Sequence, residues 1–257
     1  SAVGIGPDGE YTVEQLLEGL LMASGNDAAH ALAQAVGGDA AALDKVNEKA
    51  REIGTRSTVA ASYSGLDAAG MSTSAADISL IYRAAFANDT FARIVDTEHV
   101  DFPGWGDMPG YELWNDNGLF LNDPDGIGGK TGYTEDAHHT FVGAVNRGGR
   151  RLQAVILDTT VEHGFRAWEQ AQMLLDESSD VAPGEGVGQL EEFSAQAAEE
   201  TTEVPTPAPP TPAEAPETEQ PRSSFEDSQG WIGWVVAGLV ALLVIAVATF
   251  SLLRREP

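Results

Sequence analysis

Residues 128–134 read GGKTGYT, a lysine between glycines that is followed by a threonine, another glycine and a tyrosine. A phosphate-binding P-loop also contains Gly-Lys-Thr, but it needs a glycine five residues before the first glycine of that string and a helix directly after the threonine. Here the earlier position is Pro124, and the residues after Thr131 are typical of a strand. The P-loop interpretation therefore fails on both counts. Taken alone, the string would favour a glycine-rich turn with a solvated lysine, because such short strings recur by chance.

The residues after this string predict an antiparallel sheet. Residues 139–159, HTFVGAVNRGGRRLQAVILDT, read as two strands joined by Gly148-Gly149, a two-residue turn that tolerates positive φ. GGKTGYT precedes the first of these strands by a few residues, so we expect it to form a third, neighbouring antiparallel strand. Residues 161–176, VEHGFRAWEQAQMLLD, predict a closing helix.

The first half of the chain is helical by its periodicity. Thr12 and Gln15 form a capping box before an apolar stripe, and Gly54 is placed to end a later helix. Helices first, an antiparallel sheet later and a helix that packs back predict an α+β fold rather than repeated βαβ units. The four helical stretches are TVEQLLEGLLMA (12–23), DAAHALAQAVGG (27–38), DAAALDKVNEKAREIG (39–54) and STSAADISLIYRAAFAN (72–88).

The C-terminal part has a different composition. Trp231 to Leu253 contain no charged residue over about 23 positions, enough to cross a bilayer core of about 30 Å, and Arg254 and Arg255 follow directly. We therefore expect a single-pass protein of the cell membrane with its globular part outside and its C-terminus in the cytoplasm. The predicted organisation is a globular domain at 1–177, a disordered acidic Pro/Glu/Thr-rich linker or stalk at 178–229, a transmembrane helix at 230–253 and a cytoplasmic tail at 254–257.

Composition excludes several classes of function. A formal charge of −26 and a pI of about 4.2 argue against a nucleic-acid partner, because an anionic surface repels phosphate. The absence of cysteine excludes a disulfide, a thiolate zinc site and a cysteine nucleophile. His138 and His139 have no third ligand at metal spacing, so we expect no metal and no cofactor.

A second polar motif interrupts the first two helices. Residues 20–32 read LLMASGNDAAHAL, in which Ser24-Gly25-Asn26 breaks a continuous helical pattern. One interpretation is a local turn in which Asn26 or Asp27 caps the next helix. A hinge with Ser-x-Asn, followed about a hundred residues later by Lys-Thr-Gly on a strand, is a rarer combination and matches two of the three elements of the Ser-Lys acyl-transfer enzymes.

Three stretches carry a wider resemblance, at 11–33, 63–85 and 126–134: YTVEQLLEGLLMASGNDAAHALA, YSGLDAAGMSTSAADISLIYRAA and GIGGKTGYT. Over most of residues 1–177 the chain resembles the D-alanyl-D-alanine carboxypeptidases, the low-molecular-mass penicillin-binding proteins. The resemblance implies a penicillin-binding/β-lactamase-like transpeptidase fold, with a helical cluster and an antiparallel sheet. It also implies a serine hydrolase that removes the terminal D-alanine from peptidoglycan stem peptides through an acyl-enzyme, with β-lactams as inhibitors.

The resemblance also implies roles for individual residues. Ser24 would relay a proton near the leaving amine, and Asn26 would hold the substrate amide. Lys130 and Thr131 would hold the substrate carboxylate, so we expect Lys130 on a sheet edge, facing Ser24 across a shared cleft. Substrate binding would further involve the strand residues Gly132 and Tyr133, with the backbone N–H of Tyr133 in the oxyanion hole.

One element of the family pattern does not occur in this sequence. The nucleophile and its partner lysine come from a Ser-x-x-Lys motif upstream of the hinge, but no such motif precedes Ser24 and the first lysine is Lys45. Because the chain starts at Ser1 without a methionine or a signal peptide, we expect an N-terminally truncated form of a working enzyme. The alternatives are a catalytically inactive peptidoglycan-binding or scaffold membrane protein and a β-lactamase.

Overall fold

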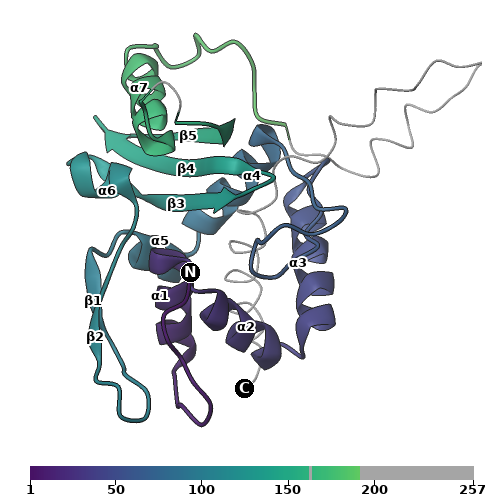
Figure 1. Cartoon of the computed structure of the whole chain (residues 1–257). Helices are drawn as coiled ribbons and strands as arrows, with labels where there is room; N and C mark the ends of the chain where they lie inside the picture. The colour runs from purple at the N-terminus through teal and green to yellow at the C-terminus, as the bar shows by residue number, and fades with distance from the viewer. Residues whose placement is uncertain (162–163, 192–257) are drawn as a thin grey trace, which may run out of the picture.

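The computed structural model describes residues 1–161 and 164–191, and Figure 1 shows how their elements are arranged. Three antiparallel strands form the main sheet in the order β3-β4-β5. They are β3 (Gly126–Thr134), β4 (His138–Arg147) and β5 (Arg150–Thr159). Gly148 and Gly149 join β4 to β5 with φ values of 58° and 78°, which glycine adopts without strain. The predicted hairpin and its neighbouring lysine strand are confirmed, and the chain continues as a strand through Thr131, where a P-loop would begin a helix.

The four predicted N-terminal helices are also confirmed. The capping box of Thr12 and Gln15 is formed in full, and Gly54 ends its helix in the left-handed conformation. Ser74 caps its helix by accepting a hydrogen bond from the backbone N–H of Asp77. The helices are α1 (Val13–Ala23), α2 (Asn26–Ala35), α3 (Asp39–Ile53) and α4 (Ala75–Phe86).

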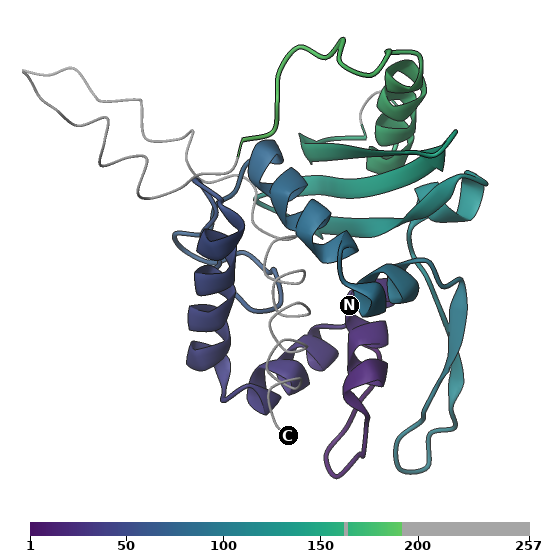
Figure 2. The ribbon, with the colours of Figure 1, turned by 180° about the vertical axis from the view of Figure 1, so that it is seen from behind.

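The sheet carries a hydrophobic core on each face. Phe141 and Val145 of β4 pack with α7 (Ala167–Ser179), whereas Val142 and Ala144 point to the helical cluster. This alternation follows from the two-residue period of a strand. Figures 1 and 2 show the result: α7 lies against one face of the sheet, and α4 crosses the other. The sheet is therefore held between the closing helix α7 on one face and α4, with the rest of the helical cluster, on the other.

Four short elements were not predicted. They connect α4 to the lysine strand, and the two short strands pair as an antiparallel hairpin. Asn88 and Asn117 each cap one of the short helices through the side-chain oxygen. An asparagine in the N-cap position was the sequence signal that could have predicted these helices. The elements are α5 (Asp89–Val95), β1 (His99–Phe102), β2 (Tyr111–Trp114) and α6 (Gly118–Asn122).

The C-terminal organisation falls largely outside the described residues. The closing helix α7 ends at Ser179, two residues beyond the boundary predicted at 177. The predicted linker is described only as far as residue 191, and the predicted transmembrane helix at 230–253 and the tail at 254–257 lie wholly outside the described part. Within residues 1–161 and 164–191, no helix has both the length and the apolar character that a membrane span requires.

Candidate active site

Ser24 forms the bend between α1 and α2. Its backbone is left-handed, with φ 55° and ψ 38°, and its N–H donates to the carbonyl oxygens of Gly19 and Leu20. A residue with a side chain seldom adopts this conformation, and such outliers concentrate at functional sites. Gly25 is the N-cap of α2, and Asn26 begins that helix. The turn thus brings Ser24 and Asn26 to one end of the helical cluster, and the capping role considered for Asn26 or Asp27 is not the one observed.

Strand β3 forms one edge of the described three-stranded sheet, as predicted, and pairs with β4 along its other side. Gly129 sits where β4 and Asn117 come very close to β3. A Cβ atom at this position would lie 2.2 Å from the carbonyl oxygen of Val142 and 2.5 Å from Nδ2 of Asn117. The glycine before Lys130 is therefore needed for packing within the protein itself.

Lys130 joins the sheet to the hinge. Its ammonium group donates a short hydrogen bond to Oγ of Ser24, and it also donates to the carbonyl oxygen of Thr131 at 2.9 Å and to Oγ1 of Thr131 at 3.3 Å. These contacts confirm the prediction that Lys130 faces Ser24. The side chain is only 1% exposed, so the lysine is an internal cation rather than the solvated one of a plain glycine-rich turn.

Burial and one carboxylate act on this cation in opposite directions. Desolvation lowers the pKa of Lys130, because the charged form loses its water, and the nearby Asp116 carboxylate partly opposes this by favouring the charge. Nζ of Lys130 lies 4.0 Å from Oδ1 of Asp116, whose side chain is 41% exposed. The buried ammonium group of Lys130 thus lies beside the hydroxyl of Thr131 and the partly exposed carboxylate of Asp116.

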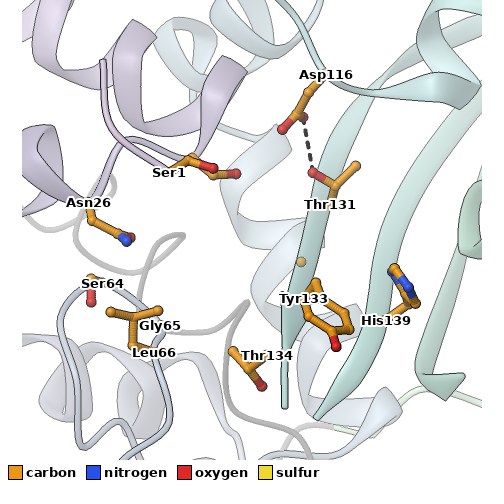
Figure 3. A pocket seen from close by; sticks show the side chains of 12 residues that line it. Ser1, Asn26, Ser64, Gly65, Leu66, Asp116, Thr131, Tyr133, Thr134 and His139 are labelled. Carbon is orange, nitrogen blue, oxygen red and sulfur yellow. Dashed lines mark hydrogen bonds between the residues drawn. The ribbon is translucent and has the colours of Figure 1, made fainter. Parts of the chain in front are cut away.

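A cavity of about 410 Å³ lies between the hinge and β3, within the size range of small-molecule sites. Figure 3 shows Ser1 and Asn26 on one side of it and Thr131 and Tyr133 of β3 on the other. The backbone N–H of Asn26 donates to the carbonyl oxygen of Ser1 at 3.0 Å. The cavity is lined by Ser1, Ser24, Asn26, Ser64, Gly65, Leu66, Asp116, Thr131, Gly132, Tyr133, Thr134 and His139.

The segment 115–117 supports the cavity from the hinge side. The Asn115 side chain donates to the carbonyl oxygens of Val95 and Thr97 at 3.1 and 3.0 Å. The backbone N–H of Asp116 donates to the carbonyl oxygen of Met22, at the end of α1. This short segment therefore links the hinge helix to the rest of the fold and presents Asp116 to the cavity.

Five of the six predicted site residues line one cavity: Ser24, Asn26, Thr131, Gly132 and Tyr133. The sixth, Lys130, lies behind that wall and reaches the cavity through its bond to Ser24. Sequence reasoning missed the loop 64–66 and Asp116. It considered His139 only as a metal ligand, whereas the centre of its ring lies 4.7 Å from that of Tyr133 at the cavity.

No group of three or more His, Asp or Glu side chains in the described residues is arranged to hold a metal ion. His138, one of the two candidates in the sequence, instead pairs with Asp158 at 2.7 Å. The polar groups of the cavity are hydroxyl, amide and carboxylate groups, backed by one ammonium group. Such a set can bind a peptide, relay protons and hold an anion without further components.

The chain is similar in sequence and fold to known proteins. The profile of a family described as D-alanyl-D-alanine carboxypeptidase matches residues 1–161. D-alanyl-D-alanine carboxypeptidase DacB2 of Mycobacterium tuberculosis is 44% identical over 193 residues, which cover 74% of this chain and 66% of the relative. The crystal structure of a D-alanyl-D-alanine carboxypeptidase from that organism matches with a TM-score of 0.69 and 42% identity, over 73% of this chain and 72% of the other.

A more distant structure, the Streptomyces K15 DD-transpeptidase, matches with a TM-score of 0.56 and 29% identity, over 65% of this chain and 66% of the other. The α+β fold is accordingly of the penicillin-binding type. The chain spans just under two thirds of the length of DacB2. From the family match over residues 1–161 and these similarities, the chain belongs to the D-alanyl-D-alanine carboxypeptidase family.

Proposed function

We propose that the protein is a serine-type D-Ala-D-Ala carboxypeptidase that removes the terminal D-alanine from peptidoglycan stem peptides. The observation that carries the proposal is the hydrogen bond from Lys130 to Ser24, which joins the lysine strand to the hinge beside a cavity of about 410 Å³. The family model matches residues 1–161, which contain both halves of that site. No cofactor is part of the proposal.

The hydrogen bond between Lys130 and Ser24 suits a proton transfer from Lys130 through Ser24 to the leaving group. In the protonated state Lys130 donates to Oγ of Ser24, which leaves the O–H proton of Ser24 available to another acceptor. Ser24 would pass that proton to the amine of the departing D-alanine and take one from Lys130. Burial lowers the pKa of Lys130, which makes the ammonium group a readier proton donor.

Substrate binding would use the edge of β3. An extended peptide can add to a free strand edge, with the oxyanion close to the backbone N–H of Tyr133. Asn26 would hold the peptide amide from the opposite wall, and Gly132 would leave room for the peptide backbone. The terminal carboxylate would lie beside the hydroxyl of Thr131, backed by the charge of Lys130.

The attacking serine needs a separate test, because the 257 residues contain no Ser-x-x-Lys. We would label two forms with a fluorescent penicillin: the 257-residue chain and the product of its gene read from its own start codon. The proposal expects covalent label on the gene product, at a serine followed three residues later by lysine. Peptide mapping by mass spectrometry identifies that residue.

A matched pair of variants controls this experiment. In the labelled gene product, Lys130→Met should reduce the acylation rate by about a hundredfold or more, because it removes the proton donor and the fixed charge. Lys49→Met removes a lysine from the exposed pair with Glu52 and should change nothing. A gene product that takes no label would instead favour a peptidoglycan-binding or scaffold protein, and fast release of hydrolysed penicillin would favour a β-lactamase.

We also propose that residues 230–253 anchor the protein in the cell membrane, with the catalytic domain outside and the C-terminus in the cytoplasm. The support is the sequence alone: an uncharged run from Trp231 to Leu253, followed by Arg254 and Arg255. An outward-facing domain agrees with a peptidoglycan substrate.

A further inference from the structure

The hydroxyl of Thr131 already has an anionic partner inside the protein. Lys130 Nζ donates to Oγ1 of Thr131 at 3.3 Å, and that Oγ1 donates in turn to Oδ1 of Asp116 at 3.0 Å, the bond drawn dashed in Figure 3. A hydroxyl has a single proton to donate. The Thr131 proton that a substrate carboxylate would need is therefore directed at an internal carboxylate.

Asp116 is held in this position by its own backbone. Its N–H donates to the carbonyl oxygen of Met22 at 2.9 Å, and Asn115 before it is buried and bonded through its side chain to Val95 and Thr97. The backbone at 116 is thus fixed, whereas the carboxylate is 41% exposed and lines the cavity. The carboxylate can turn toward solvent without moving the chain.

We propose that Asp116 is a positioning residue that occupies the carboxylate site of the free protein and sets its affinity for substrate. The inference rests on the proposed function, because it takes Thr131 and Lys130 to be the groups that hold the terminal carboxylate of the peptide. A bound peptide would take over the Thr131 proton, and Asp116 would turn away. The Asp116 carboxylate and the terminal carboxylate of the peptide would repel each other across the cavity, which weakens substrate binding.

Asp116 has a second effect of opposite sign, since it favours the charged form of Lys130. If that support dominated, removal of Asp116 would weaken the site. The geometry favours competition: Asp116 lies 4.0 Å from Lys130 but within hydrogen-bond distance of Thr131, and Lys130 keeps the acceptors Ser24 and Thr131 without it. The sign of the measured change decides between the two effects.

The test is a binding titration of the 257-residue chain in mild detergent, followed by NMR. The probes are acetyl-D-Ala-D-Ala with a free C-terminal carboxylate and the same peptide as its C-terminal amide. Asp116→Asn keeps the shape and removes the charge, so we expect the acid peptide to bind about tenfold tighter, a factor equal to about 1.4 kcal/mol, with no change for the amide. Glu135→Gln is the matched control: it removes one charge from the exposed turn after β3 and should change neither affinity.

Unchanged or weaker binding of the acid peptide by Asp116→Asn would overturn the inference, as would an equal gain for the amide. Asp116→Ala provides a second reading if the asparagine variant does not fold. Lys130→Met separates this failure from that of the proposed function. If it binds both peptides as the unchanged chain does, the carboxylate site itself is misplaced and both proposals are overturned.

Discussion

At the scale of single residues, Asp27 ties the start of the chain to the hinge. Its carboxylate accepts the backbone N–H groups of Val3, Gly4 and Ile5 at 3.0, 2.8 and 3.1 Å, as well as that of Ala28 at 2.9 Å. Burial raises the pKa of Asp27, but the four donors lower it by more, so the net shift is downward. The folded state therefore prefers the ionised form.

We predict that Asp27→Asn destabilises the chain by about 1–2 kcal/mol at pH 7. The amide nitrogen of the new side chain would face two backbone N–H donors that have then lost their acceptor. The cost stays this small because the site is partly exposed and solvent screens part of the lost interaction. Because the folded pKa is the lower one, this stabilisation is fully present above the unfolded pKa of about 3.9 and is lost as pH falls through the folded pKa. Urea unfolding of the unchanged chain and of Asp27→Asn, at pH 7 and near pH 3, measures this pH dependence. The difference between their free energies of unfolding should be smaller at the lower pH.

Asp107→Asn is the matched control, because Asp107 is exposed in the loop between β1 and β2. It should leave the free energy of unfolding unchanged within about 0.5 kcal/mol at both pH values. An Asp27→Asn protein as stable as this control at pH 7, or a gap that persists near pH 3, would contradict the assignment.

The sequence predicted some residue contacts and not others. The pairing of Lys130 with Ser24 was predicted because both belong to recognisable motifs that share a cleft. The role of Asp27 was not, because its partners Val3, Gly4 and Ile5 lie 22 to 24 positions upstream and contribute only backbone N–H groups. Contacts to backbone leave no pattern in side-chain types, so local reasoning offered only helix capping as a possible role for Asp27.

At the scale of elements, Arg147 fastens the end of β4 to two neighbours. It donates to Asp123 after α6 and to Asp176 on α7, each at 2.5 Å, and lies 3.7 Å from Asp125. The Asp123 side chain is 5% exposed, whereas that of Asp176 is 56% exposed. The bond to Asp123 is thus the one that water cannot replace.

We predict that Arg147→Met costs about 2–3 kcal/mol of stability, because it leaves the Asp123 charge buried without its partner. Asp176→Asn, at the exposed end of the same network, should cost less than about 1 kcal/mol. Adding Asp123→Asn to Arg147→Met should recover part of the loss, since it removes the uncompensated charge. Denaturant unfolding of the unchanged chain, Arg147→Met, Asp123→Asn and the double variant gives the coupling energy between Arg147 and Asp123. Strictly additive losses would show that the network does not act as described.

Element length explains which parts of the fold were predicted. The helices of ten residues or more showed a clear apolar period, and the β4–β5 hairpin was marked by Gly148-Gly149. The helices α5 and α6 have seven and five residues, too short for a period to emerge. Only their capping residues, Asn88 and Asn117, stood in the sequence as signals.

At the scale of the whole molecule, the cleft is where the two halves of the fold meet. The α+β class predicted that helices and sheet would share such a boundary, and the motifs predicted one residue set on each side. The loop 64–66 and Asp116 complete its walls from segments that lie outside both motifs. Their place depends on how α4 and α6 pack, which the periodicity of a single chain does not define.

The uncharged run near the C-terminus predicts attachment to a membrane, and it lies beyond the described residues. Trp231 to Leu253 form an uncharged run of 23 residues, about 35 Å as a helix, against a bilayer core of about 30 Å. We predict that the 257-residue chain stays in the membrane pellet after a carbonate wash, whereas residues 1–229 are released. Because the chain has no cysteine, Ser228→Cys and Pro257→Cys each introduce a single reporter for an impermeant maleimide. In intact cells only the cysteine at 228 should react, since Arg254 and Arg255 hold the C-terminus inside. Release of the 257-residue chain by carbonate would contradict the anchor. Labelling of position 257 from outside would contradict its orientation.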